Sequence, residues 1–111
     1  MKVVKKGEGQ PADAKGHFGC WTVHKLAADK DTDYGLAVTL SHFLPDGGAE
    51  MSPSPRERAY FVLSGSLVVK GKAEEYTLGP GDLVYIAAGE EREIKVAGTE
   101  PATILVIVVS K

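Results

Sequence analysis

Two polar stretches contain most of the residues that could do chemistry in this chain of 111 residues. The first, EMSPSPRERAY, runs from Glu50 to Tyr60, and the second, EEREIK, contains Arg92. An arginine guanidinium binds a carboxylate or phosphate through two parallel hydrogen bonds, whereas a phenol or a carboxyl group can transfer protons. These residue types indicate a site for a small anionic ligand, with or without proton transfer.

A histidine lies close to the first stretch. His42 is near the end of the apolar segment GLAVTLSHFL (35–44). Imidazole titrates near neutral pH and is the side chain most often used as a general base. Both faces of this segment contain apolar residues, so alternation alone does not decide whether His42 faces a cavity. His42, Tyr60 and Glu50 are therefore the candidate catalytic acids and bases.

The remaining histidines lie seven positions apart, at His17 and His24 in the segment HFGCWTVHKL. In a regular strand an odd separation places two side chains on opposite faces, so we expect these histidines at the surface or at an edge, without a joint site. Cys20 is the single cysteine of the chain and has no partner for a disulfide. We interpret it as a structural thiol.

The segments around these residues predict an all-β fold. Short apolar stretches alternate with Gly and Pro turns, and no window has the 3.6-residue period of a helix. Residues 1–16 are expected to form an N-terminal arm or short strand, and residues 17–111 a single domain. We also expect a turn at PDGG (45–48) and a hairpin around Ser64 and Gly65. The predicted strands are 17–26, 35–44, 58–65, 66–71, 82–89, 92–98 and 102–110, with one more within 72–82.

Composition argues against several kinds of partner. The net charge is −2, with both signs mixed, so we expect no nucleic acid as a partner. No apolar run reaches the length of a membrane-spanning helix, so we expect no membrane partner. One cysteine is typical of a reducing compartment, which favours a cytoplasmic location. Residues 102–110 are apolar at nearly every position and should be covered by barrel closure or by a second copy.

Two longer segments resemble the signature motifs of the cupins. These are PDGGAEMSPSPRERAYFVLSGSLVV (45–69) and GPGDLVYIAAGEEREIKVAG (79–98), which match at Gly65, Gly81 and Gly89. The resemblance spans roughly residues 35–110. It implies a cupin-type double-stranded β-helix, which is a jelly-roll barrel, and such barrels often form homodimers. We therefore expect a homodimer of this chain.

The same resemblance marks the positions where cupins bind a metal ion. Counted from the motif glycines, the two histidine positions are Ser52 and Ser54, the glutamate position is Arg58, and the last histidine position is Arg92. A serine hydroxyl is a poor metal ligand, and a guanidinium has no lone pair to offer. Two arginines in one cavity would also repel a divalent cation. We therefore expect no metal ion and no other cofactor.

In the cupin register these four side chains point into the barrel, and strand alternation places Tyr60 on the same face as Arg58. The leading hypothesis is a metal-independent barrel that binds a small acidic or sugar-like metabolite through Ser52, Ser54, Arg58 and Arg92. A second arrangement stays open. Mixed-charge stretches often form solvated faces, where each arginine would pair with a neighbouring glutamate at the rim.

Two enzymatic alternatives stand beside the binding hypothesis. The first is an isomerase, cyclase or lyase in which His42, Tyr60 or Glu50 is the acid or base and the arginines stabilise negative charge. The second is a metal-dependent dioxygenase with a displaced site. Cupins catalyse many reactions, so the resemblance predicts the scaffold and leaves the reaction open.

Overall fold

The computed structural model describes residues 1–12 and 15–110, in which the chain forms strands and no helix. No helix that could cross a membrane therefore occurs in these residues. The strands are β1 (Gln10–Ala12), β2 (His17–Leu26), β3 (Leu36–Ser52), β4 (Arg58–Ser64), β5 (Leu67–Lys70), β6 (Glu75–Leu78), β7 (Leu83–Ile86), β8 (Arg92–Val96) and β9 (Ala102–Val109).

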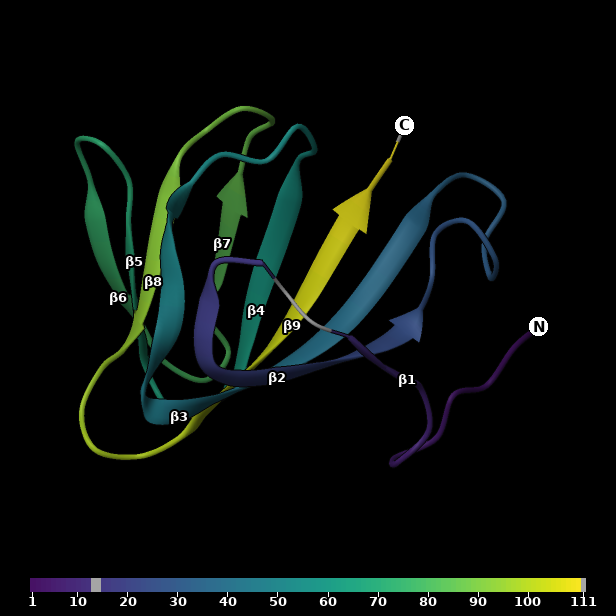
Figure 1. Cartoon of the computed structure of the whole chain (residues 1–111), viewed down its shortest axis with the longest axis horizontal. Coiled ribbons are helices and arrows are strands. Elements are labelled where there is room, and N and C mark those ends of the chain that lie inside the picture. Colours follow the sequence, from purple (N-terminus) through teal and green to yellow (C-terminus); the bar gives the residue numbers. More distant parts are fainter. Residues whose placement is uncertain (13–14, 111) are drawn as a thin grey trace.

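All strand pairs are antiparallel, in the order β6-β5-β8-β3-β9-β4-β7, with β2 paired to β3 and β1 paired to β2. The first half of β3 pairs with β9, and its second half, from Gly48, pairs with β8. Figure 1 shows the consequence: β3 bends in its middle and joins the strand group around β9 to the group around β8. The expected all-β jelly-roll barrel is confirmed.

The prediction of a turn at residues 45–48 is wrong, because β3 continues through these residues. Pro45 lies where β3 leaves β9 and has not yet met β8, so the missing N–H costs no bond in either of these ladders. The two glycines that follow permit close backbone contact. A Cβ on Gly47 would lie 2.2 Å from the Gly19 carbonyl oxygen, and one on Gly48 would lie 2.1 Å from that of Ile94. The strand therefore bends without turning back.

The prediction of a hairpin around Ser64 and Gly65 is also wrong, because β4 and β5 do not pair with each other. β4 pairs with β7 and β9, whereas β5 pairs with β6 and β8. Gly65 has a φ of 75°, and a Cβ there would lie 2.3 Å from the carbonyl oxygen of Pro101. The turn therefore packs against the chain before β9 and carries the backbone from one group of strands to the other.

The core lies between the two groups of strands. It is formed by inward-facing side chains that follow the two-residue alternation, such as Tyr60 and Val62 on β4 and Ile104 on β9. Full burial of an aliphatic or aromatic side chain contributes about 1.5–3 kcal/mol. The same alternation brings Arg58 and Arg92, at the starts of β4 and β8, into the interior, where they are 6% and 8% exposed.

Candidate functional site

A cavity of about 230 Å³ lies inside the barrel, between β2, β3, β4, β8 and β9. Its polar lining comes from two arginines, two histidines, one tyrosine and several hydroxyl groups, and the rest is mainly aliphatic and aromatic. No aspartate or glutamate lines it among the described residues. The polar side chains are those of Arg58, Arg92, His17, His24, Tyr60, Thr22, Thr39, Ser41 and Ser54.

The two arginines share one hydrogen-bond acceptor. Arg58 Nε donates to the Tyr60 hydroxyl oxygen at 2.9 Å, and Arg92 Nε donates to the same oxygen at 2.8 Å. Behind them, Arg92 Nη1 donates to the Glu50 carbonyl at 3.1 Å, and Arg58 Nη1 makes a long contact of 3.5 Å to the Arg56 carbonyl. We call Arg58, Tyr60 and Arg92 the arginine–tyrosine cluster.

The cluster leaves one donor group of each arginine for a ligand. In a guanidinium, Nε–H and Nη2–H share one edge, so each Nη2 lies on the side of the group that faces the Tyr60 oxygen. Arg58 Nη2 is buried and has no hydrogen-bond partner among the described residues. The ion pairs found in that part of the chain all involve lysines. Two buried positive charges therefore face the cavity without a carboxylate from these residues.

A β-bulge brings both His17 and His24 into the cavity lining, although they were expected on opposite faces. The register between β2 and β3 shifts between Phe18 and Cys20, where Gly19 has a φ of 56°. Between the flanking pairs there is one residue on β2, Gly19, and four on β3, and this irregular bulge breaks the two-residue alternation of β2 at Gly19. Glycine inside a strand-like segment is a signal for such a bulge, and it was available in the sequence.

The surroundings of His17 favour the neutral form of its imidazole. Its Nδ1 lies 3.1 Å from the Lys15 carbonyl oxygen, which can only accept, so Nδ1 carries the proton. Burial lowers the pKa of His17, and the charges of Arg92 and Arg58 lower it further, against the opposing effect of the hydrogen bond to Lys15. The ring stacks on Phe43, with centroids 6.4 Å apart. In the neutral ring the lone pair therefore lies on Nε2.

The structure places His42 outside the cavity, which corrects the hypothesis that it acts there. Its ring stacks on the exposed Trp21 at 4.9 Å between centroids, and its Nδ1 lies 3.0 Å from the Thr103 hydroxyl. Ser41 and Phe43, the neighbours of His42 on β3, line the cavity. Because side chains alternate along a strand, His42 faces outward.

The other predicted site residues are divided between cavity and surface. Ser54 lines the cavity, and Ser52 supports it by accepting a hydrogen bond from Arg92 Nη1 at 3.2 Å. The Glu50 side chain is exposed and does not line the cavity, although its carbonyl holds Arg92. We therefore leave Glu50 out of the acid–base candidates of this cavity.

Residues 39–108 match the cupin domain family. The chain is a cupin. A Mycobacterium tuberculosis protein named beta-D-galactosidase Rv1717 is 32% identical over 108 residues, which are 97% of this chain and 93% of that protein.

Solved structures agree with this cupin fold. The polyketide cyclase RemF from Streptomyces resistomycificus matches with a TM-score of 0.85 and 18% identity, over 100% of this cupin and 80% of RemF. A predicted oxalate decarboxylase (tm1287) from Thermotoga maritima matches with a TM-score of 0.84 and 18% identity, over 97% and 98% of the two chains. At these identities the likeness shows the fold alone.

The donors in this cupin do not fit the metal ion that the fold commonly binds. The cupin resemblance assigns Ser52, Ser54, Arg58 and Arg92 to the usual ligand positions, and the two guanidinium groups are cationic donors with no lone pair. Among residues 1–12 and 15–110, no group of three or more His, Cys, Asp or Glu side chains could hold a metal ion elsewhere. We therefore do not propose a dioxygenase with a displaced metal site.

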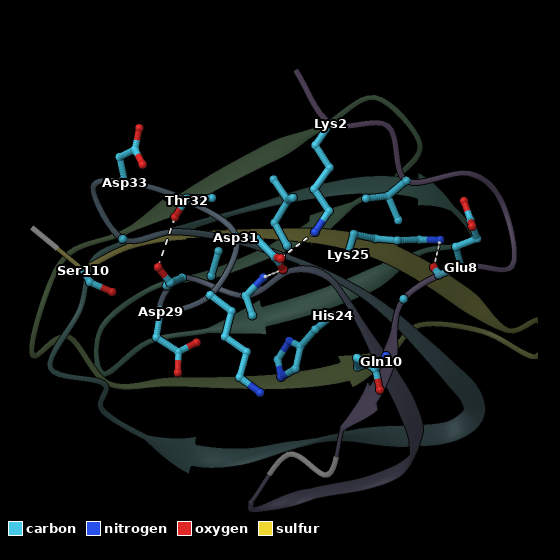
Figure 2. Close-up of a pocket in the computed structure, with 18 of the residues that line it drawn as sticks. Lys2, Glu8, Gln10, His24, Lys25, Asp29, Asp31, Thr32, Asp33 and Ser110 are labelled. Carbon is cyan, nitrogen blue, oxygen red and sulfur yellow. Dashed lines mark hydrogen bonds and ion pairs between the residues drawn. The ribbon is translucent and has the colours of Figure 1, made fainter.

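A larger, open groove of about 1440 Å³ lies outside the barrel, between the N-terminal segment and the loop after β2. Two of its lysines have partners in the groove: Lys2 forms an ion pair with Asp31, and Lys25 donates to a backbone carbonyl. Figure 2 shows the contacts of Lys2 with Asp31 and of Lys25 with the Glu8 carbonyl. His24 lines both the groove and the cavity. We place the site in the smaller cavity, because its two arginines are buried and have no carboxylate partner among the described residues.

Proposed function

We propose that this cupin binds a small anionic metabolite, such as a sugar acid or keto acid, in its barrel cavity and that it does so without a metal ion. The observation that supports this most directly is the buried, unpartnered Nη2 of Arg58 beside a second buried guanidinium. A buried charge without a partner costs several kcal/mol. A carboxylate or phosphate oxygen between the two Nη2 groups would complete the hydrogen bonds and neutralise the charge.

The size and lining of the cavity favour a small, partly polar ligand. At about 30 Å³ for each water-sized group, 230 Å³ accommodates roughly eight such groups. The hydroxyls of Thr22, Thr39 and Ser41 suit a hydroxylated ligand, whereas Ile94 and Ile104 form an apolar wall. A sugar acid or short-chain keto acid combines both kinds of surface with one anionic group.

A thermal-shift screen of sugar acids, keto acids and phosphates tests the proposal. A ligand present at 100 times its dissociation constant should stabilise the protein by about 2.7 kcal/mol. Arg58→Met should abolish this stabilisation. Arg56→Met, a matched change at an exposed arginine two residues away, should preserve it. A stoichiometric transition metal in the purified protein, or no response to any anion of the panel, would contradict the proposal.

The name of the mycobacterial relative does not lead us to propose glycoside hydrolysis in this cavity. That reaction commonly uses two carboxyl groups on opposite sides of the scissile bond. The described cavity lining contributes neither. Its cationic cluster instead favours an anionic ligand, which a neutral galactoside is not.

An isomerase, cyclase or lyase activity is the second candidate function, and the Tyr60 hydroxyl favours it. The phenol oxygen accepts hydrogen bonds from both arginines, so its own O–H proton remains available to a ligand. A proton donor flanked by two fixed positive charges is suited to reactions that develop negative charge on oxygen. A reaction screened on the anions that stabilise the protein would test this candidate, and wild-type protein without turnover on any of them would count against it.

A further inference from the structure

We propose that His17 is the general base, and Tyr60 the proton donor, in the enolisation of a 2-oxo acid bound to Arg58 and Arg92. This inference rests on the proposed anion site and adds a reaction and a substrate class to it. It replaces His42, which faces outward, with a histidine that lines the cavity.

The geometry of His17 suits a general base. The Lys15 carbonyl fixes the proton on Nδ1, and Nε2 has no hydrogen-bond partner among the described residues. The ring lines the same cavity as the arginine–tyrosine cluster and packs on Phe43, which limits its rotation. Burial and the two nearby guanidinium groups disfavour the imidazolium form of the empty site. The free lone pair is thus available to take a proton from a bound ligand.

Negative charge develops on the keto oxygen, next to the arginine–tyrosine cluster. When a 2-oxo acid places its carboxylate against the Nη2 groups of Arg58 and Arg92, its adjacent keto oxygen comes close to the Tyr60 hydroxyl, because both Nη2 groups flank that hydroxyl. The Tyr60 O–H can then donate to the keto oxygen. If the proton transfers, the resulting phenolate is stabilised by the two guanidinium groups that already donate to it.

The proposed step balances without any further reactant. His17 Nε2 takes a proton from carbon 3 of the substrate, and the electron pair of the broken C–H bond becomes the C2–C3 double bond. The π electrons of the keto group move to its oxygen, which takes the proton of Tyr60. Reversal of the step returns a proton to carbon 3. In heavy water the proton on His17 exchanges with solvent, so the substrate gains deuterium at carbon 3.

The charge and size of the cavity favour this substrate class over simple carboxylates. A 2-oxo acid presents an anionic group and a polarisable carbonyl on neighbouring atoms, as the arginine–tyrosine cluster requires. The keto group also acidifies the C–H bond on carbon 3, whereas a simple carboxylate offers a much weaker acid. Short 2-oxo acids fit within 230 Å³.

Proton NMR in deuterated, amine-free buffer tests the proposal with pyruvate, 2-oxobutanoate and 2-oxoglutarate as probes. The C3 proton signal should decay faster with wild-type protein than in buffer alone. His17→Gln should reduce the protein-dependent exchange rate by at least about 100-fold, which is the lower end of what a general base contributes. His42→Gln is the matched control on the outer face and should exchange like the wild type. Binding of each probe is measured in parallel by thermal shift.

The outcomes separate this inference from the proposed function. Probe binding and exchange in the wild type, with binding retained but exchange lost in His17→Gln, would support both. Probe binding without exchange above buffer would overturn the enolisation and leave the anion site standing. Exchange that survives in His17→Gln would overturn the assignment of the base. No binding of any anion would overturn the proposed function and this inference with it. If His17→Gln does not fold, His17→Ala with added imidazole provides the same comparison, with restored exchange as the supporting result.

Discussion

Replacing Arg58 with methionine should stabilise the empty protein while removing its ability to bind an anion. Arg58 is 6% exposed, and its Nη2 has no partner among the described residues. Its Nε and that of Arg92 contact the same phenol oxygen, so the two atoms are no more than the sum of those distances, 5.7 Å, apart. Without a ligand, the protein therefore holds two like charges close together in a buried site.

The size of the effect follows from three contributions. Two unit charges about 6 Å apart repel by roughly 3 kcal/mol at an effective dielectric constant of about 20. Burial of an incompletely paired guanidinium costs several kcal/mol more. Against these stands the hydrogen bond of Arg58 to Tyr60, and a bond of this charged kind contributes about 1.5–3 kcal/mol. Methionine retains much of the apolar stem, so Arg58→Met should raise the free energy of unfolding by at least about 2 kcal/mol.

Urea and thermal unfolding without added anions measure this effect. In a domain of about 100 residues, 2 kcal/mol corresponds to an increase in Tm of roughly 8 °C. The exposed control Arg56→Met should change the free energy of unfolding by less than about 0.5 kcal/mol. An Arg58→Met variant that is less stable than the wild type by about 1 kcal/mol or more would refute the reasoning, because Arg58 would then be a satisfied structural residue.

Three further predictions concern the bulge, the pH dependence and the outer face. Gly19→Ala should cost about 1–3 kcal/mol, because φ is 56° and the new Cβ would lie 2.8 Å from Gly47 Cα; Gly7→Ala, also at positive φ but with open space, should cost less in the same urea titration. Because the pKa of His17 is lower in the folded protein than in the unfolded chain, the unfolded chain takes up a proton at a higher pH than the folded protein. The free energy of unfolding is therefore unaffected by His17 above about pH 6.5 and decreases as the pH falls below it. His17→Gln should remove that slope near pH 6 and His42→Gln should keep it; equal slopes in both variants would contradict the assignment. We also propose a homodimer through the outer face around the exposed Trp21, so that Trp21→Glu should halve the mass in sedimentation, whereas a wild type that sediments as a monomer would exclude it.

Much of the fold could be predicted from the sequence, because its strands are specified locally. The segment 17–26 predicted from its aromatic and β-branched residues coincides with β2, and the apolar segment 102–110 contains β9. The inward direction of Arg58 and Arg92 was one of two arrangements that the sequence left open, and their burial in the structure selects it. Two-residue alternation from the motif glycines gives this arrangement only where no bulge intervenes, and in the structure the pairing of β4 is regular from Arg58 to Tyr60.

The site residues on β2 and β3 could not be assigned in the same way. The sequence reasoning expected His17 at the surface or an edge, because it did not include the irregularity at Gly19. It left the face of His42 undecided, because the segment 35–44 is apolar on both faces. The hairpin at Gly65 failed for a related reason. A glycine turn can join two strands that pair with each other, or it can carry the chain from one group of strands to the other. The contact of Gly65 with Pro101 accompanies the second arrangement.

The sequence by itself determined which residues are available and where most of the strands lie, and through the cupin resemblance it predicted serine and arginine at the metal-ligand positions. The tertiary structure alone decided that both guanidinium groups meet on one phenol oxygen, and that His17 rather than His42 shares their cavity. The physical reason is the range of the interactions. Strand formation and alternation depend on neighbouring residues, whereas bulges, strand crossings and shared acceptors depend on contacts between residues far apart in the chain.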